Sequence, residues 1–386
     1  MATIEHHAAA RAAPPVIVYS GLMFEQDCAE EPALAGRIAA ALDAMGMTEA
    51  FGPLACGADI LVAEAMLARG GHLDIVLPFA EDDFIAESVL CGGERWLSRY
   101  RRCRDAARAV HFATPLAYVD DDNQFYYNTR FAMGLAALRA QALGSEAVQL
   151  AVTSAKARSF SNTGLAGTAA DIGIWERLGK RTVIVDAGPV SRNLRFPEKS
   201  SGADKPRREI RSILFADYKG FSRLGERELP LFMREVMGRI GATLDSFEAH
   251  VEFRNTWGDA LYAIVDEPST AARLALALQR ELQDLPAALS PEGAPSGMRI
   301  GLHYGPIYVD RDRVTGADLW YGGEVNRTAR IEPVTPIGDA YCTEAFASAL
   351  ILDGAADLTV VPLGERALAK DFGTVRLYRL ARQDEP

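Results

Sequence analysis

The feature that most constrains the fold is a polar, proline-bearing interruption at residues 188–208 of this 386-residue chain. It reads GPVSRNLRFPEKSSGADKPRR and has no periodic apolar pattern, which is typical of an exposed linker. A chain of this length is too long for one ordinary hydrophobic core. We therefore predict one domain over residues 15–187 and a second over 209–386. Residues 1–14 are rich in alanine, and we expect them to be a disordered head.

Before the linker, short apolar runs alternate with segments of helical periodicity. The expected strands are residues 16–19, 50–54, 73–77, 109–113, 148–152 and 182–185, and the expected helices include 34–45, 60–67, 132–142 and 169–178. Apolar strands that alternate with helices indicate a parallel sheet covered on both faces. We predict an α/β fold for this half, a Rossmann-like, doubly wound parallel sheet.

Glycine-bearing loops follow several of these strands. Ligands of doubly wound sheets bind beyond the C-terminal strand ends, and loops that lead into helices offer backbone N–H groups to an anion. The candidate ligand-binding residues of this half are Ser20, Gly21, Gly57, Asp59, Gly164 and Thr168. The glycines equally suit tight turns alone. A strict GxGxxG motif is missing, so the loops give little support for a dinucleotide.

The run GPLACGADILVAEAML at residues 52–67, with the spacing of the loops, resembles a broad family of Rossmann-like nucleotide-sensing domains. This family includes lysine-decarboxylase-like proteins. The resemblance covers roughly residues 15–187 and its motifs are loose. It implies a regulatory domain that senses an unknown small ligand derived from a nucleotide, with little support for catalysis in this half.

Beyond the linker, the stretch RSILFADYKGFS places Asp217 after an apolar run and before a glycine-containing turn. An aspartate in this position either caps the turn or binds a cation beside backbone N–H groups. Asp259 is a second carboxylate, at the tip of a predicted hairpin. The predicted order β-α-β-β-α-β is ferredoxin-like and places the first strand beside the hairpin. Two neighbouring carboxylates repel each other, unless divalent cations lie between them, as in two-metal phosphoryl transfer.

Five segments of this half resemble, in order, the motifs of the class III nucleotidyl cyclases: FADYKGFS, WGDALYA, RIGLHYGP, YGGEVNRTAR and LAKDFGTVRLY. The match covers about residues 208–382. It implies a ferredoxin-like α+β catalytic domain and an enzyme of the phosphorus–oxygen lyase class. Such an enzyme converts a nucleoside triphosphate to a 3′,5′-cyclic nucleotide and pyrophosphate. The alternative is a catalytically silent cyclase-like module that binds nucleotides or dimerises.

The resemblance also implies a role for each matching residue. Asp217 and Asp259 would bind two Mg²⁺ or Mn²⁺ ions per site, and the main-chain carbonyl of Tyr218 would add a ligand. Asn326 would orient the ribose, and Arg330 would stabilise charge on the α-phosphate. These last two residues are four apart, which places them on one face of a helix.

Lys370 matches the lysine that binds the terminal phosphates in the family. Sites of this family lie between two head-to-tail subunits, with the metal carboxylates from one and the Asn/Arg pair from the other. Because this chain carries both sets, the resemblance implies a homodimer with two shared active sites.

The base-reading positions depart from the family pattern. Purine-selective members carry Lys or Glu where this chain has Asn255, whose amide offers both a donor and an acceptor. The second selector falls on Leu319, with Asp318 one residue earlier, and Trp257 offers a stacking surface nearby. ATP is the leading substrate if Asp318 reaches the adenine amino group. GTP and a pyrimidine triphosphate stay open, the latter giving cyclic CMP or cyclic UMP in signalling of the antiphage type.

Composition sets the remaining expectations. The formal net charge of −11 argues against nucleic acid or an anionic membrane as the main partner. The five cysteines show no CxxC spacing, as in reduced proteins. The N-terminus does not have the pattern of a signal peptide, and no run approaches the roughly 20 apolar residues of a spanning helix. We expect a cytoplasmic protein without a membrane span.

Overall fold

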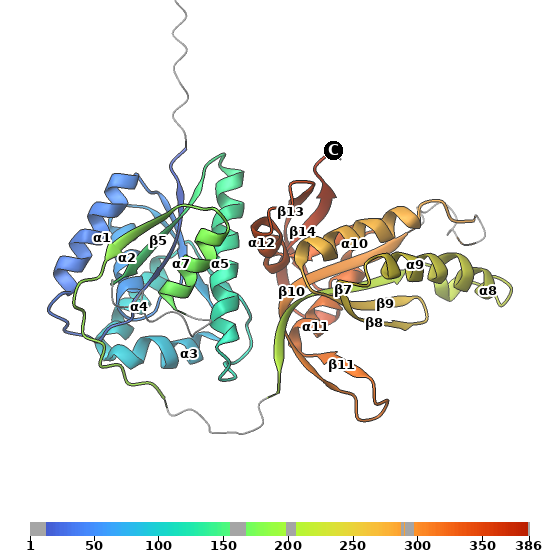
Figure 1. Ribbon diagram of the computed structural model, residues 1–386, viewed down its shortest axis with the longest axis horizontal. Coiled ribbons are helices and arrows are strands. Elements are labelled where there is room, and N and C mark those ends of the chain that lie inside the picture. The colour runs from blue at the N-terminus through green and yellow to red at the C-terminus, as the bar shows by residue number, and fades with distance from the viewer. Residues whose placement is uncertain (1–12, 155–166, 198–205, 287–288, 290–296, 385–386) are drawn as a thin grey trace, which may run out of the picture. The chain divides into compact units, whose positions relative to one another are not determined.

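The computed structural model describes residues 13–154, 167–197, 206–286, 289 and 297–384. The chain divides into two compact units, both drawn in Figure 1. The first unit comprises Met1–Phe112 and Leu135–Glu198, and the second comprises Ala113–Gly134 and Lys199–Pro386. Most of the predicted head and the predicted loop residue Gly164 lie outside the described residues.

Six parallel strands form the sheet of the first unit, in the order β4-β3-β2-β1-β5-β6. Their bounds are β1 Val16–Gly21, β2 Glu49–Gly52, β3 His72–Leu77, β4 Ala109–Phe112, β5 Ala147–Thr153 and β6 Thr182–Asp186. β5 is buried at every position, which explains its apolar run. The direction of chain progression reverses between β1 and β5, the position where doubly wound sheets bind ligands. The predicted Rossmann-like parallel sheet is confirmed.

Helices lie on both sides of this sheet (Figure 1). They are α1 Glu31–Met45, α2 Ala58–Ala68, α3 Glu81–Phe84, α4 Glu94–Ala106, α5 Asn123–Ala142 and α7 Thr168–Arg177, with a π-helical turn at Ile85–Val89 and a 3-10 turn at Leu90–Gly92. Helix α5 begins nine residues before the predicted start at 132. The added turns mix polar and aromatic residues, so their apolar period is weak, and they belong to the second unit.

The second unit is built on a mixed sheet in the order β13-β14-β12-β10-β7-β9-β8, with β11 paired to β10. Its strands are β7 Arg208–Tyr218, β8 Val251–Trp257, β9 Ala260–Val265, β10 Met298–Arg311, β11 Asp318–Tyr321, β12 Ala340–Thr343, β13 Leu358–Ala367 and β14 Thr374–Arg382. Within the run β10-β7-β9-β8 adjacent strands are antiparallel, whereas β10 and β12 are parallel. This is the predicted ferredoxin-like arrangement.

The predicted helix over 229–248 forms with a π-helical turn in its middle. The helical elements of this unit are α8 Leu229–Phe232, the π-helical turn Met233–Met237, α9 Gly238–Ser246, α10 Pro268–Glu281, α11 Gly323–Thr328, α12 Glu344–Leu352, and 3-10 turns at Phe221–Arg223, Glu332–Val334 and Ala369–Asp371. α10 packs on α9 and on strands β7 and β10, whereas α11 packs mainly on β10. Within the described residues, no helix has the length and apolar character that a membrane crossing requires.

The apolar run of β7 forms the centre of this unit. Ile213 packs in a buried cluster with Tyr262, Ile264, Ile307 and Trp320. The next residue, Leu214, is also wholly buried, although successive side chains of a strand point to opposite faces. A strand segment covered on both faces is mostly apolar, and Asp217 follows directly on the apolar run of β7.

Residues 113–134 are part of the second unit although they precede the predicted linker. The Tyr127 hydroxyl donates to the Tyr304 carbonyl oxygen at 2.6 Å. Arg130 lies 3.7 Å from Asp353. The first domain was expected to span residues 15–187 without interruption, but residues 113–134 pack with the second unit. The reason is that Tyr127 and Arg130 contact Tyr304 on β10 and Asp353 just after α12.

Candidate active site

Strand register brings the two predicted carboxylates together. In the β7–β9 pair, Asp217 is opposite Ala260, the residue after Asp259. The hairpin between β8 and β9 turns through Gly258 and Asp259, and Gly258 has a φ of 64°, a left-handed conformation that favours glycine. The tight turn thus holds Asp259 beside the end of β7.

The electrostatics of the two carboxyl groups show that they interact. Burial raises the pKa of Asp259, and the charge of Asp217 and a hydrogen bond with it raise this pKa further. Arg299 opposes the shift. The guanidinium of Arg299 lies across the β7–β10 pair and donates to Asp217 Oδ2 at 2.5 Å.

Glu332 is a third carboxylate of this site, and the sequence reading did not identify it. Its Oε1 lies 2.6 Å from Nη2 of Arg299. Burial and the charge of Asp217 raise the pKa of Glu332, and Arg299 lowers it; together these effects bring the pKa to about 7. Glu332 lies two residues beyond Arg330, the last residue of the quoted segment YGGEVNRTAR, and nothing in the sequence indicated where its side chain points.

The donor set fits a divalent cation. Two adjacent carboxylates offer hard oxygen ligands of the kind Mg²⁺ and Mn²⁺ prefer. Among the described residues, no three His, Cys, Asp or Glu side chains are arranged to hold a metal ion by themselves. The other ligands would therefore be water, phosphate oxygens and main-chain carbonyls such as that of Tyr218, as is common for Mg²⁺.

Asn326 is an exposed residue of α11, and Arg330 is half-buried beyond the end of that helix at Thr328. The Arg330 N–H donates to the Arg327 carbonyl oxygen at 3.0 Å, an i to i−3 bond that tightens the chain after the helix. The predicted placement of both residues on one regular helix is therefore wrong, because the next turn, at Glu332–Val334, is a 3-10 turn.

The loop of Lys370 lies beside Arg330. The Ala369 N–H points to the Arg330 carbonyl oxygen at 3.5 Å, and Ile331 and Leu368 share a buried cluster with Leu377. Lys370 is exposed and has a φ of 60°, an uncommon backbone conformation for a non-glycine residue. The tertiary structure thus places two predicted phosphate-binding cations on adjacent segments.

The predicted base-reading residues lie on β8 and β11. Asn255 and Trp257 are exposed on the edge strand β8, and Asp318 is exposed and Leu319 half-buried on β11. Tyr262, opposite Asn255 in the register, donates its hydroxyl to the Trp320 carbonyl oxygen at 2.9 Å, which ties β11 to this part of the sheet. Which base these residues select stays a prediction.

Arg254, the residue before Asn255 on β8, forms an ion pair with α9. Its Nη1 lies 2.7 Å from Asp245 Oδ1, on α9. Both side chains are at least half exposed, so the ion pair adds little to stability.

The predicted loop residues of the first unit pack tightly. A Cβ at Gly21 would lie 2.4 Å from the Ala58 Cβ, so β1 and α2 meet only because residue 21 is glycine. Gly57 has a φ of 93° at the N-cap of α2. Asp59 is buried, and its Oδ2 accepts from the Ala55 N–H at 3.3 Å. Burial raises the pKa of Asp59. Thr168, also buried, begins α7.

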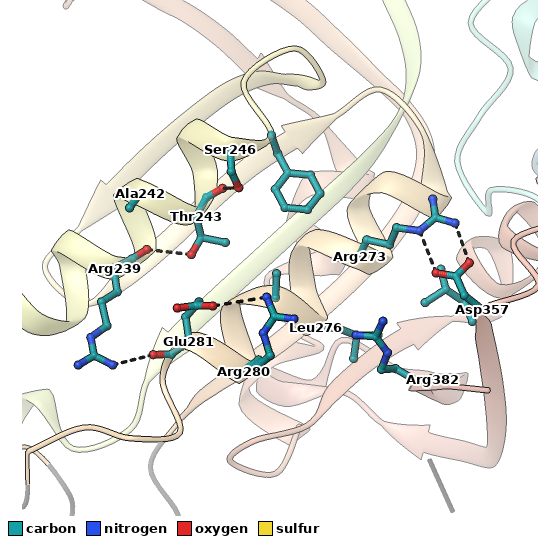
Figure 2. Close-up of a pocket in the computed structure, with 13 residues that line it drawn as sticks. Arg239, Ala242, Thr243, Ser246, Arg273, Leu276, Arg280, Glu281, Asp357 and Arg382 are labelled. Atoms are coloured by element: carbon teal, nitrogen blue, oxygen red, sulfur yellow. Dashed lines mark hydrogen bonds and ion pairs between the residues drawn. The ribbon is translucent and has the colours of Figure 1, made fainter. Parts of the chain in front are cut away.

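A hollow of about 440 Å³ lies on another part of the second unit (Figure 2). Two of its arginines are engaged in Figure 2: Arg273 binds Asp357 through two hydrogen bonds of 3.0 and 2.7 Å, and Arg239 donates to the Glu281 carbonyl oxygen at 3.1 Å. None of the predicted site residues lines this hollow.

Comparison with known proteins agrees with this geometry. Residues 204–368 match a family model described as the adenylate and guanylate cyclase catalytic domain. A search of curated proteins finds no match. The second unit therefore contains a cyclase catalytic domain of this family over residues 204–368, as its resemblance to the class III enzymes predicts. Such a domain makes the chain a nucleotidyl cyclase, a phosphorus–oxygen lyase acting on a nucleoside triphosphate, and domains of this family use divalent metal ions.

Solved structures similar to part of the chain include three cyclases. The adenylyl cyclase CyaB from P. aeruginosa is 17% identical, with 47% of this chain and 100% of that chain covered and a TM-score of 0.40. The guanylate cyclase domain of RhGC from Catenaria anguillulae, solved with GTP, is 18% identical, with 46% and 98% covered and a TM-score of 0.39. A Trypanosoma brucei adenylate cyclase, solved as a monomer, is 23% identical, with 47% and 94% covered and a TM-score of 0.38.

Proposed function

We propose that this chain cyclises a nucleoside triphosphate to a 3′,5′-cyclic nucleotide and pyrophosphate with two Mg²⁺ or Mn²⁺ ions per site. The observation that carries the proposal is the strand register, which places Asp217 opposite Ala260 and so brings Asp217 and Asp259 to adjacent strand ends. These carboxylates and the Tyr218 carbonyl would hold the ions. When bound, the ions would lower the pKa of the 3′-hydroxyl and offset the charge of the triphosphate.

The remaining residues of the chain act on the substrate. In the reaction the 3′-oxygen loses its proton and bonds to the α-phosphorus, while the bond from that phosphorus to the β-phosphate oxygen breaks and pyrophosphate leaves. Arg330 donates hydrogen bonds to the α-phosphate as negative charge develops there. Asn326 orients the ribose, and Lys370 binds the terminal phosphates. The contact of the Ala369 N–H with the Arg330 carbonyl oxygen supports these roles, because it places the loop of Lys370 beside Arg330.

We further propose that the active form is a homodimer with two shared sites. The carboxylates Asp217 and Asp259 of one subunit would face Asn326 and Arg330 of the other. A closed two-fold dimer of this kind uses both sets of residues twice. The proposal is supported by the sequence, because one chain carries both the metal-binding carboxylates and the Asn/Arg pair.

The leading substrate is ATP, with Asp318 as the residue that accepts from the adenine amino group. Its exposed position at the start of β11 leaves the carboxylate accessible. The alternative is a pyrimidine triphosphate, for which the amide of Asn255 offers both a donor and an acceptor.

Pyrophosphate release with Mn²⁺, measured separately on ATP, GTP, CTP and UTP, tests this function. We expect turnover on one of the four, and loss of that turnover in the Asp217→Asn variant. Turnover of none would favour the silent nucleotide-binding module and refute the proposed catalysis. Turnover of CTP or UTP alone would replace the ATP assignment.

The first unit would sense a small nucleotide-derived ligand and regulate the cyclase. Support comes from buried polar atoms that have no hydrogen-bond partner among the described residues, at the end of β5 and the start of α2: the Thr153 hydroxyl and Asp59 Oδ1. Deleting residues 1–205 would also remove residues 113–134 from the second unit, so point substitutions are the better test. AMP, ADP and inorganic phosphate should be added to the full chain and to Asp59→Asn. Unchanged unfolding temperature and turnover with all three would count against a sensor of this chemistry.

A further inference from the structure

Arg299 on β10 lies against two carboxylates at once. Its Nη2 donates to Asp217 Oδ2 at 2.5 Å and lies 2.6 Å from Glu332 Oε1. The side chains of all three residues are at most 26% exposed. Water screens charges weakly in such a setting. The guanidinium therefore acts strongly on both carboxylates.

The two contacts of this guanidinium differ in quality. Asp217 accepts a hydrogen bond, whereas Glu332 Oε1 is buried and accepts none from the described residues in spite of the short distance. Arg299 Nε is also buried and has no hydrogen-bond partner in the described part of the chain. Buried polar atoms without partners cost stability. A rotation of the guanidinium toward Glu332 would supply the hydrogen bond that this carboxylate lacks.

The main chain of Glu332 is fixed against β10. Arg299 and Gly301 are two residues apart on this strand and so face the same side of the sheet. A Cβ at Gly301 would lie 2.8 Å from the main-chain nitrogen of Glu332, so the turn that begins at Glu332 approaches β10 closely because residue 301 is glycine. The preceding residue, Ile331, is wholly buried. Glu332 is thus held on the side of β10 that carries Arg299.

Arg299 competes with a metal ion for Asp217. A carboxylate oxygen that accepts a hydrogen bond from a guanidinium is less available to a divalent cation, and the two cations repel each other. We propose that Glu332 is a positioning residue that takes the guanidinium of Arg299 from Asp217 when a divalent cation binds there. The inference rests on the proposed function, which assigns Asp217 to the metal site. Glu332 thus sets the affinity of that site for the cation through Arg299.

Mn²⁺ binding to the full-length chain without nucleotide tests this role, with free Mn²⁺ measured by electron paramagnetic resonance. The variants are Glu332→Gln, Arg299→Met and the double variant. We expect Glu332→Gln to raise the Kd for Mn²⁺ about tenfold, because Arg299 then stays on Asp217. In the Arg299→Met background the same substitution should change the Kd less than about threefold. A wild-type Kd in Glu332→Gln, or an equal effect in both backgrounds, would overturn the proposal, since equal effects mean that Glu332 acts by its charge alone.

Glu332→Asp is a second test that needs no change at Arg299. It keeps the charge but shortens the side chain by one methylene group, so it should raise the Kd for Mn²⁺ at least about threefold. Wild-type affinity in this variant would contradict the positioning role. The matched control is Glu344→Gln, because the Glu344 carboxylate lies 2.8 Å from Arg376 and its side chain is 15% exposed, against 13% for Glu332. This control should leave the Kd unchanged.

These measurements separate the role of Glu332 from the proposed catalysis. If Mn²⁺ binding changes as expected but no nucleotide is turned over, the cyclase proposal fails and the role of Glu332 stands. If a nucleotide is turned over and Glu332→Gln has equal effects with and without Arg299, only the role of Glu332 fails. A wild type that binds no Mn²⁺ would overturn both.

Discussion

Arg299 and Asp217 face each other across strands β10 and β7, and Arg299 Nη2 lies 2.5 Å from Asp217 Oδ2. The same nitrogen lies 2.6 Å from Glu332 Oε1. One guanidinium thus serves a site that also contains Asp259, whose pKa burial and Asp217 raise. The three carboxylates outnumber Arg299 and Lys219, the two cations that lower the pKa of Glu332, and such an excess of negative charge favours the binding of divalent cations.

Removing either metal carboxylate should stop cyclisation without unfolding the protein. We expect Asp217→Asn and Asp259→Asn each to lower kcat at least about 100-fold. Asp259→Asn should not lower the unfolding temperature in metal-free buffer, because it removes a repulsion with Asp217. Pyrophosphate release and thermal unfolding measure the two effects. Turnover within about twofold of the wild type in both variants would rule out their role.

Complementation tests the shared sites. Asp217→Ala and Arg330→Ala chains, inactive alone, should recover about a quarter of wild-type turnover when mixed in equal amounts and allowed to exchange subunits. Half of the dimers are then mixed, and each mixed dimer has one intact site of two. The control mixes Asp217→Ala with Asp259→Ala, which lie on the same side of each site and should recover nothing. Equal recovery in both mixtures would contradict the arrangement.

Glu324 should stabilise the fold above acidic pH. Glu324 Oε2 lies 3.0 Å from His303 Nε2 and 3.0 Å from Arg327 Nε. Its pKa is lowered from the usual 4.5 to about 2, so its contribution is full above about pH 4.5 and is lost as the pH falls toward 2. The free energy of unfolding should therefore exceed that of Glu324→Gln at pH 7, and the difference should shrink by about 1 kcal/mol between pH 5 and pH 3.5. Urea unfolding measures it.

The matched control for that experiment is Glu365→Gln, at an exposed position of β13. It should show no comparable dependence on pH. A difference between the wild type and Glu324→Gln that stays constant from pH 7 to pH 3.5 would show that the carboxylate charge is not what stabilises α11.

Asp318 should discriminate between bases. If its carboxylate accepts from the adenine amino group, Asp318→Ala should lower kcat/KM for ATP roughly tenfold relative to its effect on UTP. The UTP reaction of the same variant is the internal control, since uracil has no amino group. A uniform loss on both substrates would indicate a role for Asp318 in positioning β11 instead.

Much of the fold was predictable because local patterns determine it. The apolar runs of β1, β5 and β7 are buried on both faces, so hydrophobicity alone predicts these strands. The hairpin at Gly258 and the ferredoxin-like order also follow from neighbouring residues. In contrast, the first turns of α5 have mixed polar and aromatic residues, and their helical structure depends on partners such as Tyr304 and Asp353, more than 170 residues away.

The residues of the site also fall into two groups, those that the sequence indicated and those that only the structure revealed. Motifs and their order determined by themselves that the second half is a cyclase domain, and they indicated Asp217 and Asp259, because those residues lie at strand and turn positions that local sequence specifies. Only the tertiary structure showed Glu332 beside Arg299, and His303 beside Glu324. Both pairs join segments distant in the chain, and a contact made by register and packing leaves no periodic signal in either segment.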